Sequence, residues 1–394
     1  MVTLHYCPLV QEEFYIKIYR WLLVDIFDLK LVRYVLLVVQ PVLIFVMFVQ
    51  TYVFIYKFDL DYLIKYGPSY LMTLYVTLTC VCLYFIIDVV KHVEKEIGSW
   101  NIENAMSPNV REKLRRDTHN GFASMIVSLI LGLLTGIMIS ALEDEDKHFI
   151  FATQFIKYLP KGKITIFFIN LVRFFCCLSA YLIAVAPAHH MVYGFIKQRT
   201  AAYVIMERME RINYGYENLQ YKNLNEDYQK AVSERLVWNI KLHVKNCMLG
   251  REVERRTKAL MLPFKICGNL IFVSLAAYYF SIGRFSLSWD ILRLISLISI
   301  SLFTLFALTT CGQSVEDLSD EIFDTSVRVK WYHWSQANKK TYLIYLINAQ
   351  KPFKISFSEN ISLNYQLAVD ILGAFVSALT FVVQLQNARD PESV

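Results

Sequence analysis

The segment ILGAFVSALTFVVQLQ at residues 371–386 decides the fold of this chain. It is too apolar for the surface of a soluble protein, yet small and polar residues interrupt it at helical spacing. A membrane helix interrupted in this way faces something other than lipid, either a packed neighbouring helix or a water-filled pore. The interruptions share one face of the helix and are called the polar stripe: Asp370, Gly373, Ser377, Thr380 and Gln384.

Apolar runs of similar length recur along the 394 residues, of which 56% are hydrophobic. Because a helix needs about 20 apolar residues to cross a bilayer, the sequence predicts an all-α membrane protein with seven transmembrane helices. The first 30 residues lack the pattern of a signal peptide, so we expect the amino terminus to be retained. The seven expected spans are residues 31–56, 69–90, 122–142, 164–187, 260–282, 291–311 and 364–386.

The distribution of basic residues predicts the orientation of these spans. With the amino terminus inside, the cytoplasmic segments carry 29 of the 40 Lys and Arg residues, and the outer segments carry eight. Because basic loops stay cytoplasmic, we expect a cytoplasmic amino terminus and an extracellular carboxy terminus. The net charge of +6 then lies beside anionic lipid and indicates no nucleic-acid partner. The sequon at Asn360 would lie inside and stay unmodified.

The segments between the spans predict the domain organisation. Spans 4 and 5 are expected to continue as helices into the cytoplasm, because the segment between them keeps a helical apolar rhythm. The apolar stretch at 341–348 is too short to span, and we expect it to pack against these extensions. Pro352 then breaks the chain before the last span. The predicted order is an interfacial or re-entrant segment at 1–30, helices 1–4 at 31–194, a cytoplasmic helical anchor at 195–258, helices 5 and 6 at 259–311, a further anchor segment with the inner part of helix 7 at 312–360, the pore-lining outer part of helix 7 at 361–386, and an extracellular tail at 387–394.

Candidate catalytic and metal sites are missing from the sequence. No P-loop, HExxH, GxSxG or dinucleotide-binding glycine pattern occurs, so we expect neither enzyme activity nor a cofactor. His189 and His190 lack a third ligand nearby, and the eight cysteines include no CxxC pair, so neither a metal site nor a disulfide framework is expected. Arg173 within span 4 either pairs with a neighbouring helix or lines a hydrated pocket.

Two features of the last helix favour a pore over simple packing. Gln384 and Gln386 stand at its outer end and Asp370 stands at its inner end, an arrangement suited to cations. A single helix cannot form a conduit, so a pore requires several subunits around an axis.

The last 80 or so residues resemble insect odorant receptors, the seven-helix ligand-gated ion channels. The resemblance rests on Cys311-Gly312 followed by Val315, on Trp331 and Trp334, on Gln350-Lys351-Pro352, and on LGAFVSALTFVVQLQ at 372–386. Gustatory receptors end with TY, five hydrophobic residues and QF, of which this chain preserves only the outline. The loop between spans 4 and 5, at about 64 residues, is much shorter than in the co-receptor and so indicates a ligand-tuning subunit.

The resemblance implies a heterotetramer with the co-receptor in the plasma membrane of a sensory dendrite, in which the last helices line a shared non-selective cation pore. By motif, Phe381 matches a hydrophobic gate position and Gln384 the polar constriction outside it, although Phe is bulkier than the Val usual in the co-receptor. The ligand would be a small apolar volatile, enclosed in the outer half of the bundle. The residues expected to contact it, chosen by depth and chemistry, are Leu74, Tyr75, Leu78, Leu133, Ile137, Phe167, Leu171, Phe174, Tyr278, Tyr279 and Ile295.

Three other classes remain as alternatives. A gustatory receptor channel would function without the co-receptor. A G-protein-coupled receptor would have the opposite orientation, and the sequence carries neither a DRY-type motif after span 3 nor NPxxY in span 7. A transporter would show inverted repeats, and none is evident.

Overall fold

The computed structural model describes residues 17–56, 60–100, 106–140, 162–216, 225–282, 289–351, 353–358 and 361–389. Within these ranges the protein is almost entirely helical, and each of the seven expected spans falls in a separate long helix. The predicted all-α fold is therefore confirmed. The seven helices are α2 (Lys30–Tyr56), α3 (Leu60–Ser99), α4 (Pro108–Ser140), α6 (Lys163–Glu210), α7 (Glu226–Ile282), α8 (Trp289–Val327) and α10 (Tyr365–Arg389).

Three shorter elements complete the described chain. The 3-10 helix η1 (Asp25–Asp28) precedes α2, and residues 17–23 just before it are also helical. Helix α9 (Gln336–Ala349) lies between α8 and α10. The strands β1 (Ser356–Ser358) and β2 (Ile361–Ser362) form a small antiparallel hairpin that leads into α10.

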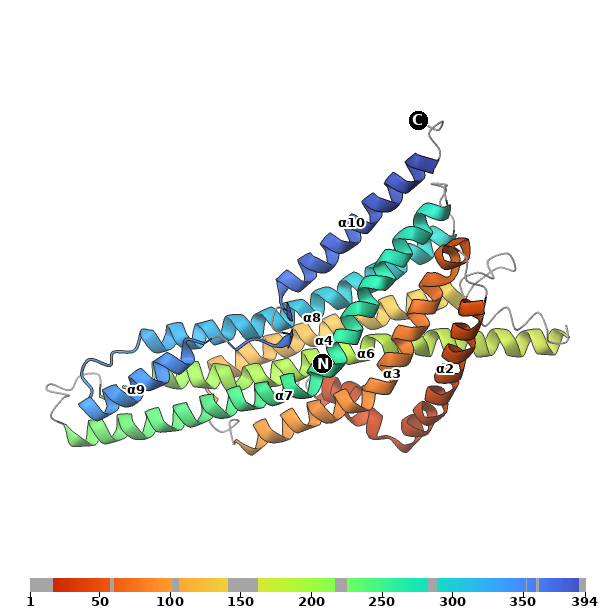
Figure 1. Ribbon diagram of the computed structural model, residues 1–394. Coiled ribbons are helices and arrows are strands. Elements are labelled where there is room, and N and C mark those ends of the chain that lie inside the picture. Colours follow the sequence, from red (N-terminus) through yellow and green to blue (C-terminus); the bar gives the residue numbers. More distant parts are fainter. Residues whose placement is uncertain are drawn as a thin grey trace, which may run out of the picture.

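Helix α6 is the centre of the bundle, since it packs against α3, α4, α7 and α8. Helices α6, α7 and α8 are much longer than a membrane crossing needs, and they run on together to the end of the molecule where α9 lies (Figure 1). Spans 4 and 5 therefore do continue as helices, as the apolar rhythm predicts. Helix α10 contacts α7 and α8, and it projects away from α8 toward the carboxy terminus (Figure 1).

Four stretches of the described helices are long and apolar enough to cross a membrane: Lys30–Val49, Tyr70–Ser99, Pro108–Met138 and Leu294–Val327. Two shorter apolar stretches, Ile266–Tyr278 and Tyr365–Phe381, lie in α7 and α10. The orientation of the termini stays a prediction.

An aromatic cluster holds α9 against the far ends of α6 and α7. Trp334 and Tyr342 are buried there, with their rings 5.1 Å apart and edge to face. Asn213, which follows α6, accepts hydrogen bonds from Trp334 Nε1 at 3.0 Å and from the Tyr228 hydroxyl of α7 at 2.8 Å. The short apolar stretch at 341–348 thus packs where the sequence predicts, and Trp334 of the motif is an internal anchor.

Candidate functional site

Helix α10 begins at a defined junction with α8. Asn364 caps its first turn, accepting a hydrogen bond from the Leu367 amide at 3.3 Å. The Asn364 side-chain amide in turn donates to Glu316 of α8 at 3.5 Å, and Glu316 forms an ion pair with Lys354 at 2.5 Å. The amino-terminal end of α10 is therefore tied to α8 on both sides of the hairpin.

One face of α10 packs on the bundle. Leu367 and Ile371 are buried in an apolar cluster that also contains residues of α3, α6, α7 and α8. One turn further on, the ring of Phe375 meets Phe272 of α7 edge to face, with centroids 5.5 Å apart. The residues of α10 that contact the bundle are thus spaced four apart and share a single face of the helix.

The polar stripe lies on another side of α10 and is exposed. At about 100° per residue it points far from the face that carries Leu367 and Ile371. The Thr380 hydroxyl donates to the Val376 carbonyl at 2.9 Å, and Asp370 accepts from Gln366 at 2.8 Å, so both polar groups are satisfied within their own helix. Packing within this chain therefore does not explain the stripe. The exposed side chains or positions are Asp370, Gly373, Ser377, Thr380 and Gln384, joined by Phe381 at 60% exposure.

Two glycines receive the linker that precedes α10. A β-carbon on Gly312 of α8 would overlap the Leu363 backbone carbonyl and lie 2.7 Å from Leu363 Cγ. A β-carbon on Gly250 of α7 would overlap the Phe353 ring. The sequence motif marks Gly312 without indicating its role, and no sequence signal singled out Gly250.

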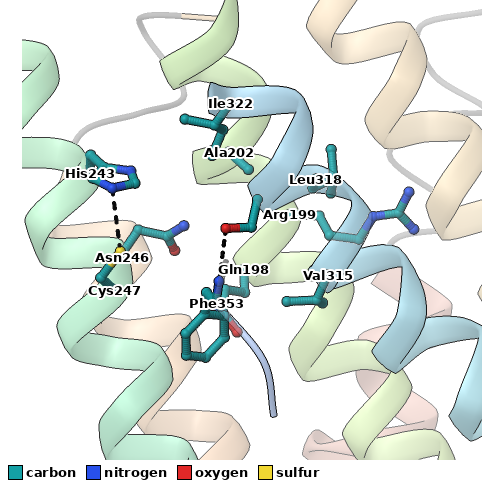
Figure 2. Close-up of a pocket in the computed structure, with 11 residues that line it drawn as sticks. Gln198, Arg199, Ala202, His243, Asn246, Cys247, Val315, Leu318, Ile322 and Phe353 are labelled. Atoms are coloured by element: carbon teal, nitrogen blue, oxygen red, sulfur yellow. Dashed lines mark hydrogen bonds between the residues drawn. The ribbon is translucent and has the colours of Figure 1, made fainter. Parts of the chain in front are cut away.

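A small polar cavity of about 20 Å³ lies beside Phe353, between α6, α7 and α8 (Figure 2). That is the size of about one water molecule. The Phe353 amide donates to Ser319 Oγ at 2.9 Å across it. Asn246 Oδ1 and His243 Nδ1 are buried without a partner among the described residues, and burial lowers the pKa of His243. Phe353 of the linker thus forms one wall of this small cavity.

A second apolar cluster lies where α3, α7 and α8 meet in the half of the bundle away from α9. Tyr75 of α3 and Tyr278 of α7, two of the predicted ligand contacts, share it. The Tyr75 ring also meets Phe264 edge to face, with centroids 5.6 Å apart. The other members are Leu71, Met72, Ile271, Leu275, Leu294, Leu297 and Ile298.

The remaining predicted ligand contacts divide into three groups. Leu74 is half-buried on α3, and Leu78 packs against the cluster that holds Leu367 and Ile371. The side chains of Leu133, Ile137, Phe167 and Ile295 are exposed on the surface of the chain, and none of them is a member of the cluster that contains Tyr75 and Tyr278. Several residues named in the sequence analysis lie where the structure does not describe the side chain or the backbone: Leu171, Phe174, Tyr279, Arg173, Gln386, Pro352 and Asn360.

His189 and His190 of α6 are both buried. Nδ1 of His190 lies 2.6 Å from the Ala186 carbonyl, and its ring stacks obliquely on Phe27. No group of three His, Cys, Asp or Glu side chains suited to a metal occurs among the described residues.

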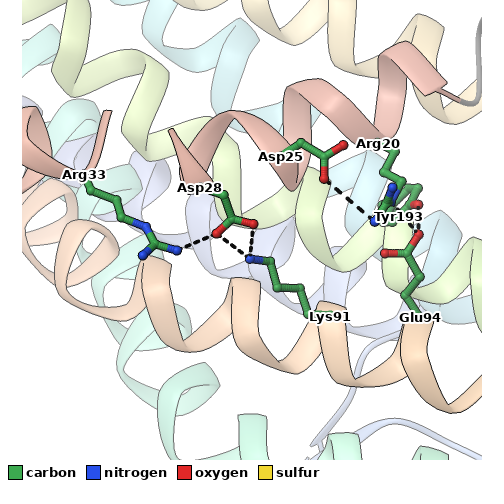
Figure 3. Close-up of polar contacts among 7 residues, drawn as sticks. All are labelled: Arg20, Asp25, Asp28, Arg33, Lys91, Glu94 and Tyr193. Atoms are coloured by element: carbon green, nitrogen blue, oxygen red, sulfur yellow. Dashed lines mark hydrogen bonds and ion pairs between the residues drawn. The ribbon is translucent and has the colours of Figure 1, made fainter. Parts of the chain in front are cut away.

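A charged network that sequence reasoning missed joins the amino-terminal helix to α3 and α6 (Figure 3). Arg20 pairs with Glu94 at 2.9 Å, and Glu94 also accepts from the Tyr193 hydroxyl at 3.0 Å. Asp28 accepts from Lys91 and Arg33, both at 2.5 Å, and the hydrogen bond from Lys91 is the first cause of its lowered pKa. The amino-terminal helix is therefore attached to the bundle by paired charges.

The comparisons with known proteins agree with this architecture. The family model described as "7tm Odorant receptor" matches residues 63–374. The structure of the insect olfactory receptor OR5 from Machilis hrabei is similar with a TM-score of 0.64 and 13% identity, and the same receptor in complex with eugenol with a TM-score of 0.59 and 10% identity. Each match covers 88% of this chain and 88% of the other. No match was found among the curated proteins.

Proposed function

Because this chain belongs to the 7tm odorant receptor family, we propose that it is the ligand-binding subunit of an odorant-gated, non-selective cation channel formed with a co-receptor. It would reside in the plasma membrane of a sensory dendrite, with its amino terminus cytoplasmic and its carboxy terminus outside. The observation that carries the proposal is the polar stripe of α10, which is exposed in the isolated chain.

A shared pore accounts for that exposure. Polar groups facing lipid are costly, and the stripe finds no partner on the bundle. Assembly of several subunits around an axis would turn the stripes toward one another and toward water. Gln384 would then constrict the outer end of the conduit and Phe381 would help to close it.

The apolar cluster around Tyr75 and Tyr278 is the proposed floor of the odorant pocket. Its side chains are apolar apart from the two tyrosine hydroxyls, which suits a small volatile with few hydrogen bonds. The other predicted contacts, Leu133, Ile137, Phe167 and Ile295, are not members of this cluster. They would contact the ligand only if it extended beyond the cluster.

Helix α7 would connect the pocket to the pore. It supplies Ile271, Leu275 and Tyr278 to the apolar cluster and Phe272 to the contact with Phe375 of α10. A ligand that binds the open arrangement more tightly shifts the population toward it, and a shift of α7 would move α10 through this ring contact.

The test is to express the chain with and without the co-receptor and to record currents evoked by a panel of volatiles. We expect cation currents only from the pair. A current from the chain alone would favour a gustatory type of channel. No current from the pair would contradict the proposal, provided that a tag confirms both chains at the surface. An amino-terminal tag accessible on intact cells would overturn the orientation and favour a G-protein-coupled receptor.

A further inference from the structure

An open groove of about 650 Å³ lies between the carboxyl end of α3 and the middle of α7. These two helices pack against each other along this part of the bundle. The groove is distinct from both the apolar cluster and the polar cavity near Phe353, since it shares no residue with either. The charged and titratable side chains that line it are His92, Glu96, Lys245, Arg251, Glu252 and Arg255.

Three cations in the groove have no carboxylate partner within the described part of the chain. Arg251, Arg255 and Lys245 are all exposed, and they line one side of α7. Arg251 and Arg255, four residues apart, share one face of α7, and Lys245 lines the groove from a position six residues before Arg251. Their side chains are therefore available to an anion from outside the chain.

The acidic residues of the groove do not cancel this charge. Glu252 is already engaged, because it pairs with Arg256 at 2.5 Å and with His92 at 3.2 Å. The hydrogen bond with His92 is the first cause of the lowered pKa of Glu252, and the one with Arg256 is the second. The Glu252 carboxylate is therefore already paired with these two residues. Glu96 is left as the single opposing charge among the lining residues, and the groove stays basic.

The depth of the groove suits one kind of anion. The expected span of α7 begins at residue 260, so Arg255 lies about 8 Å and Arg251 about 14 Å below the hydrocarbon along the helix. The polar headgroup layer is roughly 5–8 Å thick on each side of the bilayer. Arg255 is thus level with the phosphates of any phospholipid, whereas Arg251 lies beyond them.

Only a headgroup that projects further into the cytoplasm reaches both arginines. A phosphorylated inositol ring carries its additional phosphates on that side of the glycerol phosphate, and Arg binds phosphate in a planar, bidentate manner. Phosphatidylserine extends no phosphate to this depth. Basic pockets at the cytoplasmic boundary of membrane helices are known to suit such headgroups.

We propose that the groove between α3 and α7 binds the headgroup of a phosphoinositide from the cytoplasmic leaflet, with Arg255 on the glycerol phosphate and Arg251 on a ring phosphate. The proposal rests on the cytoplasmic placement of this region in the proposed function, but it requires neither a pore nor an odorant. Lys245, further from the membrane, adds attraction for the same ring.

The experiment measures binding of a fluorescent phosphatidylinositol 4,5-bisphosphate to the purified full-length chain in detergent, by anisotropy. We expect R251Q/R255Q to bind roughly 30-fold more weakly, given about 1 kcal/mol for each of the two basic residues near an anionic headgroup. The matched control is K241Q/K258Q, which removes two exposed lysines of α7 that do not line the groove. It should bind within about twofold of the parent chain.

Three further arms separate the possible outcomes. R251K/R255K keeps both charges and should retain most of the binding, and a thermal melt checks that each variant is folded. Unlabelled phosphatidylserine should not displace the probe, and soluble inositol trisphosphate should displace it only at higher concentration than the lipid.

The proposal is overturned if no binding occurs, if the two double glutamine variants lose binding equally, or if phosphatidylserine competes as well as the phosphoinositide. Because none of these measurements uses an odorant or a current, they leave the proposed channel function untouched.

Discussion

Gly250 of α7 lies so close to the ring of Phe353 that a β-carbon at position 250 would overlap it. The Phe353 amide is held on the other side by Ser319 of α8 at 2.9 Å. The linker between α9 and α10 is thus seated between two helices of the bundle. A change that displaces Phe353 should disturb the amino-terminal end of α10.

Gly250→Ala should lower the free energy of unfolding by about 1–3 kcal/mol, because overpacking forces the Phe353 ring or helix α7 to move. In a chain that already carries Phe353→Ala, the glycine substitution should cost less stability than it does in the parent chain. The reason is that the nearest obstacle, the Phe353 ring, is then absent. Gly268→Ala, also in α7, is the control, because nothing lies within 4 Å of a β-carbon there. Equal melting temperatures for the two alanine variants would show that the linker yields freely.

Gly312→Ala should be destabilising in the same assay but should resist rescue. The atom that a β-carbon at position 312 meets first is the Leu363 backbone carbonyl, which no side-chain substitution removes. Gly312→Ala combined with Leu363→Ala should therefore remain at least as unstable as Gly312→Ala alone. Recovery in the double variant would mean that the side chain, and not the backbone, sets the limit.

Phe381→Ala should raise the basal current of the assembled channel, and Gln384→Ala should change the relative permeability of cations. Both residues are exposed on α10 and free to face a conduit. Leu372→Ala is the control, because Leu372 is exposed on another side of the same helix. If basal current and reversal potentials stayed at parent values in both variants, the polar stripe would be a surface for subunit packing.

Tyr75→Ala should shift the odorant concentration for half-maximal current upward by roughly tenfold, because about 1.5 kcal/mol of apolar burial is lost. Leu133→Ala, at an exposed predicted contact, should leave the dose-response curve unchanged. The opposite pattern, with Leu133→Ala shifting the curve and Tyr75→Ala not, would place the pocket outside the cluster of α3, α7 and α8.

The thermal stability of the protein should fall below about pH 6.5, the usual pKa of histidine, and His243→Gln should reduce this fall. Burial lowers the pKa of His243 in the folded state, so the unfolded chain takes up the extra proton. The stabilisation is complete above the unfolded pKa and is lost as the pH drops through that value. His243 faces Cys247, whose sulfur lies 3.6 Å away, and the Tyr345 ring, and Arg199 lines the same cavity.

The control for this measurement is His119→Gln on the exposed side of α4. This variant removes an exposed imidazole instead of a buried one, and its stability between pH 7 and pH 5 is compared with that of His243→Gln. If His243→Gln and the parent chain lost stability in parallel, the buried imidazole would contribute nothing to the acid sensitivity.

The helices themselves were predictable because hydropathy and helical period are local properties of a sequence. Each expected span overlaps one long helix, and even the apolar rhythm at 195–258 correctly indicated that α6 and α7 run on beyond the membrane length. Helix α9 was predictable for the same reason, although its attachment through Asn213 to Trp334 was not. Asn213 carries no local pattern that distinguishes it from a solvent-exposed residue.

The predicted ligand contacts show what local reasoning leaves open. Tyr75 and Tyr278 were selected by depth and chemistry and do share a cluster, whereas Leu133 and Phe167 were selected on the same grounds and are exposed. Depth along a helix follows from the sequence, but the rotation of that helix depends on its neighbours. For a helix that is apolar all round, the sequence offers no periodicity from which to read the buried face.

From the sequence alone follow the helical class, the seven apolar runs, the polar stripe of the last helix and the basic segments that predict orientation, since each depends on the spacing of residues within one segment. The tertiary structure alone decided that the stripe is exposed, that Gly250 and Gly312 receive the linker, and that Arg251 and Arg255 line a groove with the end of α3. These relationships join residues on different helices. Helices in a bilayer associate through close packing and interhelical hydrogen bonds, so their rotation and register are settled only when all of them pack at once.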